Sequence, residues 1–467
     1  GTNYYKIQDA IDNASADDTL HIWAWTYYEA LEIDESISII GNASSTTKII
    51  AGSGQYNSDL DSVIEITSDD VTLRNLTIIQ NATNFTYGIK SVNNDITISN
   101  SIIDYWTSSA YGKIALYAQG DNFVISNNSI YEAEYCIELT ESDGALVENN
   151  IFGRDSSPSE QSKCFIQVYL SDNNIIKNNT FTDSRYGISV SDSSNNVVSD
   201  NTIIKDLNFE KHGIHLGGSS TNNQIINNTV SGYENGIESR ADLNYFSGNV
   251  LDDNHYGILF RDGSEYNKVE NNTIKNNEYY GIFIQDTSKS NEFWNNTISS
   301  SGEYDFYIEE NSSGHFAVNT PFSTIYVESV SDILIREFLD LNVTDARGLN
   351  ISGIDIRIKV GDSVKYSTEY FGGSDSKTDA NGTITTFLIN SKEYDGSSTP
   401  TVIPTSVSAK SDDWVETNTF DPSNTISITV PDLRVLNTRL GDSPLYYNIQ
   451  TAIDNADEGD TILAWNG

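Results

Sequence analysis

Short apolar segments alternate with polar residues along the first two thirds of the chain at a nearly constant interval. Strings such as ISNNSI, VENNIF, IKNNTF and VENNTI each set one asparagine between β-forming residues. This asparagine recurs about every 24 residues, at Asn75, Asn100, Asn128, Asn150, Asn179, Asn201, Asn228, Asn249, Asn272, Asn296 and Asn319. Self-similarity at a fixed period of this length is typical of repeat architectures.

A second signature lies between successive asparagines. It is a glycine, or a residue in its place, followed by isoleucine, at Gly88, Cys136, Gly187, Gly213, Gly236, Gly257 and Gly281. A period of 20 to 30 residues with two or three short strands and no helical spacing predicts one coil of a parallel β-solenoid. We therefore expect an all-β chain in which residues 1–320 form a parallel β-helix.

Stacked coils place equivalent residues about 4.8 Å apart. Asparagine carries both a donor and an acceptor, so identical asparagines can bond to one another inside a turn. The sequence therefore predicts an inward-facing asparagine ladder, with Asn75 among its members.

The opening segment adds a second kind of element. Ile7–Ala14 has the pattern of a short amphipathic helix, and Asp17-Asp18-Thr19 leads from it into a strand over Leu20–Ala24. Together with the repeats, residues 4–320 resemble the right-handed parallel β-helices of the pectate-lyase-like superfamily, especially NosD-type and carbohydrate-binding and sugar-hydrolase repeats of secreted proteins. The resemblance implies that the helix caps the first coil, whose backbone would otherwise stay unpaired.

The period stops after Asn319, and a different pattern follows. Residues 321–435 alternate apolar and polar positions between tight turns such as Asp379-Ala380-Asn381-Gly382. This pattern predicts a β-sandwich, and it resembles the immunoglobulin-like spacer modules of surface proteins.

The tail repeats the beginning of the chain. Tyr446–Ala456 matches Tyr4–Ala14 at a constant offset of 442 residues. We expect residues 436–467 to start a second, incomplete β-helix, as a covalent continuation or as a contact between subunits. Either arrangement predicts self-association end to end.

Charge and composition restrict the partners. The net charge is −41, which excludes nucleic acid. No apolar run reaches the length of a membrane span. The chain has 27 tyrosines and 26 lysines and arginines, and we expect an extracellular, cell-surface protein.

Two kinds of covalent modification are predicted. Five sequon asparagines stand one residue before a ladder position, where the side chain faces outward, and we expect glycosylation at Asn127, Asn178, Asn227, Asn271 and Asn295. Cys136 and Cys164 fall in adjacent coils, close enough for a disulfide. Two buried free thiols are the alternative.

Two columns of side chains are further candidates for binding. Tyrosines stand beside the glycine signature and either stack at a coil corner or bind sugars, at Tyr87, Tyr135, Tyr186, Tyr256, Tyr280 and Tyr304. A partial acidic column offers oxygen ligands that suit Ca²⁺, at Asp192, Asp262, Asp286 and Glu310. The alternative for the acidic column is a row of solvated turn carboxylates.

One outward-facing group has the residue types of a catalytic site. His215 stands above Glu238, with Arg240 and Arg261 in neighbouring coils. Related lyases and epimerases remove a sugar-ring proton with a base and a cation. The galacturonase-type and epimerase motifs of the superfamily are absent from the repeats, so we do not expect an enzyme in the first instance.

The expected function is that of a structural repeat unit of an extracellular or cell-surface filament or layer. The alternatives are a secreted polysaccharide lyase, hydrolase or epimerase, and a glycan-binding adhesin. We expect no cofactor other than possible Ca²⁺, and surface glycans are possible partners.

Overall fold

The computed structural model describes most of the chain. The described residues are 2–52, 60–81, 85–105, 113–153, 165–182, 184–205, 211–345, 348–411, 414–420, 425–430, 435–437, 445–446, 453 and 462–464. They divide into two compact units. Unit 1 holds residues 1–315, 320–332 and 396–398, and unit 2 holds the remainder.

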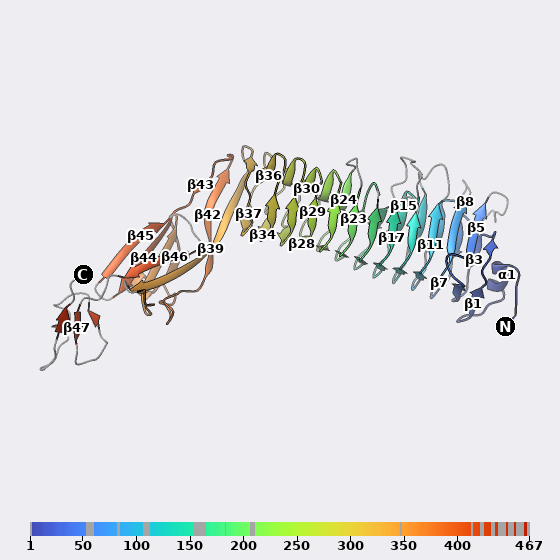
Figure 1. Cartoon of the computed structure of the whole chain (residues 1–467), viewed down its shortest axis with the longest axis horizontal. Coiled ribbons are helices and arrows are strands. Elements are labelled where there is room, and N and C mark those ends of the chain that lie inside the picture. The colour runs from blue at the N-terminus through green and yellow to red at the C-terminus, as the bar shows by residue number, and fades with distance from the viewer. Residues whose placement is uncertain are drawn as a thin grey trace. The chain divides into compact units, whose positions relative to one another are not determined.

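Unit 1 is a parallel β-helix in which each coil adds one strand to each of three sheets (Figure 1). The first sheet, here sheet A, contains β1 (Thr19–Ile22), β4 (Ser38–Gly41), β7 (Thr72–Arg74), β10 (Thr97–Ser99), β13 (Val124–Ser126), β16 (Leu146–Glu148), β19 (Ile175–Lys177), β22 (Val197–Ser199), β25 (Gln224–Ile226), β28 (Tyr245–Ser247), β31 (Lys268–Glu270) and β34 (Glu292–Trp294). Sheet B contains β2 (Thr26–Tyr27), β5 (Lys48–Gly52), β8 (Thr77–Asn81), β11 (Ile102–Tyr105), β14 (Ser129–Tyr131), β17 (Ile151–Gly153), β20 (Thr180–Thr182), β23 (Thr202–Ile204), β26 (Thr229–Ser231), β29 (Val250–Asp252), β32 (Thr273–Lys275) and β35 (Thr297–Ser299). Sheet C contains β3 (Leu31–Ile33), β6 (Ser62–Ile66), β9 (Tyr87–Ser91), β12 (Ile114–Ala118), β15 (Tyr135–Thr140), β18 (Phe165–Tyr169), β21 (Ile188–Ser191), β24 (His212–Gly217), β27 (Asn235–Ser239), β30 (Tyr256–Phe260), β33 (Tyr280–Ile284), β36 (Tyr304–Ile308) and β38 (Ile325–Val327).

The core of unit 1 is a set of apolar columns that run along the sheets. In sheet A, Ile98 pairs with Ile125, and Ile125 pairs with Val147 in the next coil. All three side chains are fully buried. Burial of one apolar residue per strand in every coil explains the regular period, and the predicted all-β solenoid is confirmed.

The predicted asparagine ladder is present from Asn128 to Asn296. In each rung the backbone N–H donates to Oδ1 of the next asparagine, as Asn179 does to Asn201 at 3.0 Å. Asn179 Nδ2 also donates to Asn201 Oδ1 and to the backbone oxygen of Val147, both at 3.0 Å. The amide thus bonds to the coil before it and to the coil after it.

The prediction was wrong at both ends of the ladder. Asn75, Asn100 and Asn319 have φ values of 59°, 50° and 45°, so they occupy the left-handed turn position. The inward position belongs to the next residue in each coil, and these residues are Leu76, Ser101 and Thr320. Asparagine tolerates positive φ, so it can occupy either the turn position or the inward position that follows it. An alignment of the repeats on asparagine alone can therefore be wrong by one residue.

A second ladder, not expected from the sequence, runs beside the first at the start of the sheet A strands. Its members are fully buried and follow one another at Asn174, Asn196, Asn223, Asn244, Asn267 and Asn291. It ends where Asn291 N–H donates to His315 Nδ1, from β37 (His315–Val318), at 3.2 Å. The double asparagines in SDNNII, SSNNVV and STNNQI are the signal that marks it.

Helix α1 (Ile7–Ile11) lies at the N-terminal end of unit 1, beside β1 and β3 (Figure 1). Its Ile7 and Ile11 are buried. The carboxylate of Glu29 accepts hydrogen bonds from the N–H groups of Ile7 and Gln8 at 3.0 and 3.1 Å. These bonds satisfy two amides that a helix start leaves without partners.

Unit 2 is built from β strands around its own apolar core. Its elements are β39 (Asp332–Asp345), β40 (Asp355–Val360), β41 (Ser363–Ser367), η1 (Glu369–Phe371), β42 (Phe387–Asp395), β43 (Thr401–Val402), β44 (Thr405–Ser411), β45 (Trp414–Phe420) and β46 (Thr425–Val430). A four-stranded sheet has the order β41-β40-β44-β45, and Leu341, Ile356 and Val407 are among the buried core residues. The immunoglobulin-like assignment and the boundary at residue 321 stay predictions.

The tail contains three short strands, β47 (Val435–Asn437), β48 (Leu445–Tyr446) and β49 (Ile462–Ala464), with β47 paired antiparallel to both others. Most of residues 436–467 lie outside the described residues. The second β-helix in this segment therefore stays a prediction.

The ladder generates the first testable prediction. Asn179→Ala and Asn228→Ala each leave buried amides without partners, so we expect each change to lower the free energy of unfolding by about 1–3 kcal/mol. Thr297→Ala, at an exposed position beside the ladder, is the matched control and should change it by less than about 0.5 kcal/mol. Thermal and denaturant unfolding measure the effect, and unchanged stability in both ladder variants would contradict it.

Candidate functional site

Polar side chains of consecutive coils stack on the outer surface of sheet C. The register pairs Gln167 with Ser189, Ser189 with His215, and His215 with Glu238. Isoleucines at the preceding positions of these strands, such as Ile214 and Ile237, are fully buried. The fold therefore presents one outward residue per coil at a spacing of about 4.8 Å.

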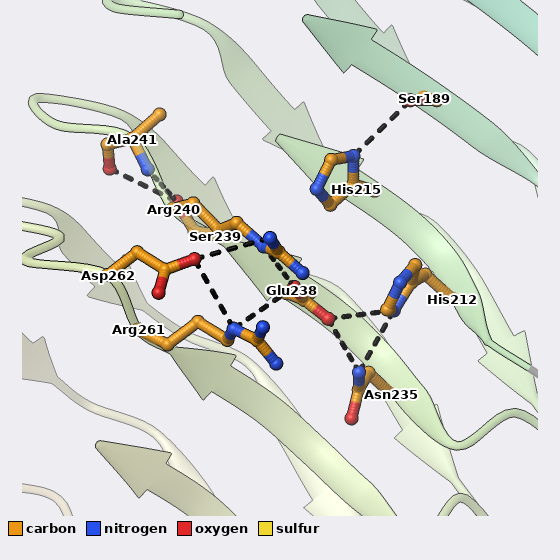
Figure 2. A network of polar contacts seen from close by, with 10 residues as sticks. All are labelled: Ser189, His212, His215, Asn235, Glu238, Ser239, Arg240, Ala241, Arg261 and Asp262. Atoms are coloured by element: carbon orange, nitrogen blue, oxygen red, sulfur yellow. Dashed lines mark hydrogen bonds and ion pairs between the residues drawn. The ribbon is translucent and has the colours of Figure 1, made fainter. Parts of the chain in front are cut away.

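Glu238 is the centre of this group, and its side chain is fully buried although it lies on the outer surface of the sheet (Figure 2). Its Oε2 lies 2.8 Å from His212 Nδ1 and accepts a hydrogen bond from Asn235 Nδ2 at 2.7 Å. Its Oε1 accepts from Arg240 Nε at 2.6 Å, and Arg261 Nε lies at 3.7 Å. Side chains from three coils thus cover one carboxylate.

This environment keeps Glu238 ionised. Burial alone would raise the pKa of Glu238, but the hydrogen bond and charge of His212, with the hydrogen bond from Arg240, outweigh burial and lower it to about 2. A buried carboxylate with four polar neighbours is a fixed negative charge at neutral pH, not a proton donor.

The two arginines are fixed on one side and open on the other. Asp262 accepts from Arg240 Nη1 at 3.2 Å and lies 3.5 Å from Arg261 Nε. Both guanidinium side chains remain roughly one-third exposed. Glu238 and Asp262 therefore hold Arg240 through Nε and Nη1 and lie beside Nε of Arg261, while part of each side chain stays exposed (Figure 2).

The surroundings of His215 favour its uncharged form. Burial, the largest cause, and the charges of His212 and Arg240 lower the pKa of His215 to about 4. Its Nδ1 lies 3.3 Å from Ser189 Oγ, and its ring stacks on His212 with centroids 5.2 Å apart. At neutral pH His215 is an uncharged imidazole beside two arginines.

A depression of about 320 Å³ lies over this group. Its walls include His212, His215 and Arg240, and a row of rings at Tyr135, Phe165 and Tyr186. Ring centroids in this row are 4.7 Å apart for Tyr135 and Phe165 and 5.2 Å apart for Phe165 and Tyr186. The volume is at the small end for ligand sites.

The tyrosine column continues beyond the depression. Tyr256 and Tyr280 have centroids 5.5 Å apart, and Tyr280 and Tyr304 are 6.1 Å apart. The rings therefore contact one another from coil to coil, as corner stacking requires. Binding of sugars to this row stays a prediction.

The structure brings together the four residues that the sequence singled out, His215, Glu238, Arg240 and Arg261. Sequence reasoning missed His212 and Asn235, which contact Glu238 directly. A strand alternates its faces with a period of two, which places residues three apart on opposite sides. At the start of β24, two consecutive buried residues separate His212 from His215, so positions 212 and 215 face outward together, and Asn235 of β27 pairs with His212.

The members of the acidic column differ in their contacts. Asp262 pairs with the arginines, and Asp192 Oδ1 accepts from the Ser219 N–H at 3.0 Å. Asp286 and Glu310 are exposed. Among the residues that the structure describes, no group of three or more His, Cys, Asp or Glu is arranged to hold a metal ion. Calcium binding at Asp262, Asp286 and Glu310 stays a prediction.

The five sequon asparagines are exposed at positive-φ turn positions, as their predicted outward orientation requires. They are Asn127, Asn178, Asn227, Asn271 and Asn295. Cys136 is buried and disulfide-bonded. Cys164 lies outside the described residues, so the pairing of the two cysteines stays a prediction, as does glycosylation.

The Glu238 group generates a prediction about acid stability. The carboxyl has a pKa of about 2 in the folded chain and about 4.5 when unfolded, so its stabilising effect is complete above pH 4.5 and is lost as the pH falls through 2. The difference corresponds to about 3 kcal/mol. When the pH falls from 5 to 2, the free energy of unfolding of the native chain should decrease by about 3 kcal/mol more than that of Glu238→Gln.

The matched control is Glu310→Gln, at an exposed carboxylate in the same unit, which should follow the native curve. Chemical denaturation monitored by circular dichroism at several pH values measures both. Parallel curves for the native chain and Glu238→Gln would show that Glu238 is not held ionised.

Two family models match the chain. The model described as "Periplasmic copper-binding protein (NosD)" matches residues 165–353, and the model described as "Right handed beta helix region" matches residues 62–230. No curated protein sequence matches the chain. Within the described ranges, no helix has the length and apolar character of a membrane span.

The first description names copper binding. Copper sites in proteins use histidine, cysteine and methionine. The chain has no methionine, and the described part holds no metal-ligand group of three or more His, Cys, Asp or Glu. The described residues do not fit a copper site, and we assign no copper chemistry to them.

Solved structures with the same fold include two sugar-modifying enzymes. The A-module of a mannuronan C-5 epimerase from Azotobacter vinelandii is 16% identical, with a TM-score of 0.50, over 67% of this chain and 92% of that chain. A periplasmic alginate epimerase is 15% identical, with a TM-score of 0.50, over 68% of this chain and 84% of that chain. The resemblance to right-handed parallel β-helix proteins is therefore confirmed.

Proposed function

We propose that this chain modifies an acidic polysaccharide by removing a ring proton next to a uronate carboxylate. The observation that carries the proposal is the Glu238 group, in which a neutral histidine and Arg240 line an open depression and Arg261 lies in the next coil. A base and a cation are the two groups that such a proton transfer needs.

The arginines would bind the uronate carboxylate. A guanidinium presents a planar fork of donors that matches a carboxylate. Glu238 and Asp262 hold Arg240 in place and leave part of its fork at the surface. The binding site for the substrate carboxylate is thereby formed before the substrate binds, which lowers the free energy needed to reach the transition state.

His215 would take the proton. The C–H bond next to the carboxylate breaks, its electron pair moves into the carboxylate, and the proton goes to the imidazole. Arg240 and Arg261 stabilise the added negative charge. For inversion, water would deliver a proton to the opposite face of the carbon, and His215 would release its proton to solvent. For cleavage, the glycosidic oxygen would leave the neighbouring carbon and take up the proton from His215.

The pKa values favour this chemistry over hydrolysis. A glycoside hydrolase needs a carboxylic acid that is protonated at working pH. Glu238 has a pKa of about 2 and stays ionised. His215, with a pKa of about 4, is a weak base in the free chain, and an incoming uronate carboxylate would raise that pKa toward a useful value.

The comparisons supply support at the level of fold and location. Both similar structures are named as epimerases of mannuronan or alginate, which are acidic polysaccharides. One of these names and one family description contain the word periplasmic. We propose a location outside the cytoplasm, in the periplasm or at the cell surface.

The proposal is tested with polymannuronate, polyguluronate and polygalacturonate. Incorporation of deuterium from heavy water reports inversion, and unsaturated sugar ends report cleavage. His215→Ala should lower kcat at least about 100-fold. His255→Ala is the matched control, because His255 is a histidine of the same unit that pairs with Glu278 and does not line the depression.

No proton exchange with any of the three polymers, at enzyme concentrations that detect slow turnover, would refute the enzyme. Saturable binding of a polymer without exchange would instead identify a glycan-binding adhesin. Equal loss of activity in His215→Ala and His255→Ala would show that His215 is not the base.

We propose a filament or layer unit as the second candidate, and one observation favours it. The tail repeats Tyr4–Ala14 at Tyr446–Ala456, which is what tandem β-helix units would produce. An open sheet end offers unpaired backbone to a neighbour, and a head-to-tail contact that does not close generates a filament.

Deletion of residues 442–467 tests this candidate. We expect the deletion to shorten or abolish the polymer while the circular dichroism of the β-helix is unchanged. Electron microscopy and sedimentation measure polymer length. A native chain that stays a monodisperse monomer at high concentration would contradict self-assembly.

A further inference from the structure

Large aromatic side chains are exposed around α1, far along the β-helix from the Glu238 group. Trp23 is 78% exposed, Trp25 is 69% exposed and Tyr28 is 58% exposed. Aromatic rings are the side chains that gain most from burial, so rings left in water at one end of the unit call for a binding function.

A pocket of about 470 Å³ opens beside these rings. It is lined by the N-terminal segment, α1, β1, Trp23 and the end of β2. Tyr4, Trp23 and Tyr27 supply aromatic surface, while Lys6 and His21 supply polar groups. Its lining contains no aspartate or glutamate, although the chain has 67 of them.

Hydrogen bonds hold the walls of the pocket together. The Glu29 carboxylate accepts from two amides at the start of α1. The Gln8 side chain donates to the Glu32 backbone oxygen at 3.0 Å and accepts from its N–H at 2.9 Å. Tyr27 Oη donates to the Trp23 backbone oxygen at 3.2 Å. The rings are therefore carried on a fixed frame, which lowers the cost of binding.

We propose that this pocket binds a pyranose glycan of neutral charge, with a sugar ring stacked on Trp23. One face of a pyranose ring is apolar and its edge carries hydroxyls, which matches rings beside Lys6 and His21. The pocket shares no residue with the depression over Glu238, so the inference goes beyond the proposed function.

The charge of the chain selects the neutral ligand. At −41 the surrounding field opposes an approaching polyanion. Over Glu238 two arginines offset that field locally, whereas the pocket at α1 has Lys6 as its one lysine or arginine. A neutral sugar approaches without this penalty, and a lining without carboxylates leaves its hydroxyls free to bond.

Isothermal titration calorimetry with cellohexaose tests the site, and a mannuronate hexamer serves as the acidic ligand for comparison. We expect saturable binding of cellohexaose that Trp23→Ala weakens at least about tenfold. Trp25→Ala is the matched control, because Trp25 is exposed to a similar degree but does not line the pocket. It should keep the affinity within about twofold, and His215→Ala should bind like the native chain.

Several results would overturn the proposal. Absence of binding to cellohexaose, or equal losses in Trp23→Ala and Trp25→Ala, would remove the site. Tighter binding of the mannuronate hexamer than of cellohexaose at low salt would refute the neutral ligand. Concentration-dependent association in sedimentation that Trp23→Ala abolishes would assign the surface to a second copy of the chain. Retained binding in His215→Ala separates this site from the proposed enzyme.

Discussion

The whole β-helix depends on one constraint, that a residue in one coil meets its equivalent in the next at about 4.8 Å. An inward polar group then finds most of its hydrogen-bond partners in the coils above and below. Asparagine meets that demand because one amide donates and accepts, as Asn179 does between Val147 and Asn201. Each ladder ends at a residue other than asparagine, Thr320 in one and His315 in the other, and that side chain accepts the last hydrogen bond.

The same constraint builds the candidate site. Because the ladders and apolar columns fix the backbone of each coil, outward positions are free to change without disturbing the fold. Three successive coils place Ser189, His215 and Glu238 in one outward column. The site is therefore a local change of side chains on a repeating frame, and its geometry follows from the register of the strands.

This division explains how much could be predicted from the sequence. The period, the β-helix and ladder members such as Asn179 follow from patterns that repeat many times. Asn75 was misplaced because asparagine suits both the left-handed turn position and the inward one. His212 and its register partner Asn235 were missed because β24 places two buried residues between His212 and His215, which breaks the two-residue alternation where the site lies. The residue types of the site could be predicted from the sequence, whereas the contacts among them could be seen only in the structure.

The charge on Glu238 is the feature that a structural role explains least. Burying a carboxylate costs free energy that hydrogen bonds and ion pairs only partly return, and a neutral residue of similar size is often as stable. Elsewhere in the same column the coils stack neutral groups such as Ser189, or charged groups such as Glu65 and Lys90 that stay partly exposed. A scaffold alone needs no buried anion with two arginines and two histidines around it. Ionised groups held in fixed positions beside an open depression are what a site for charged substrates requires.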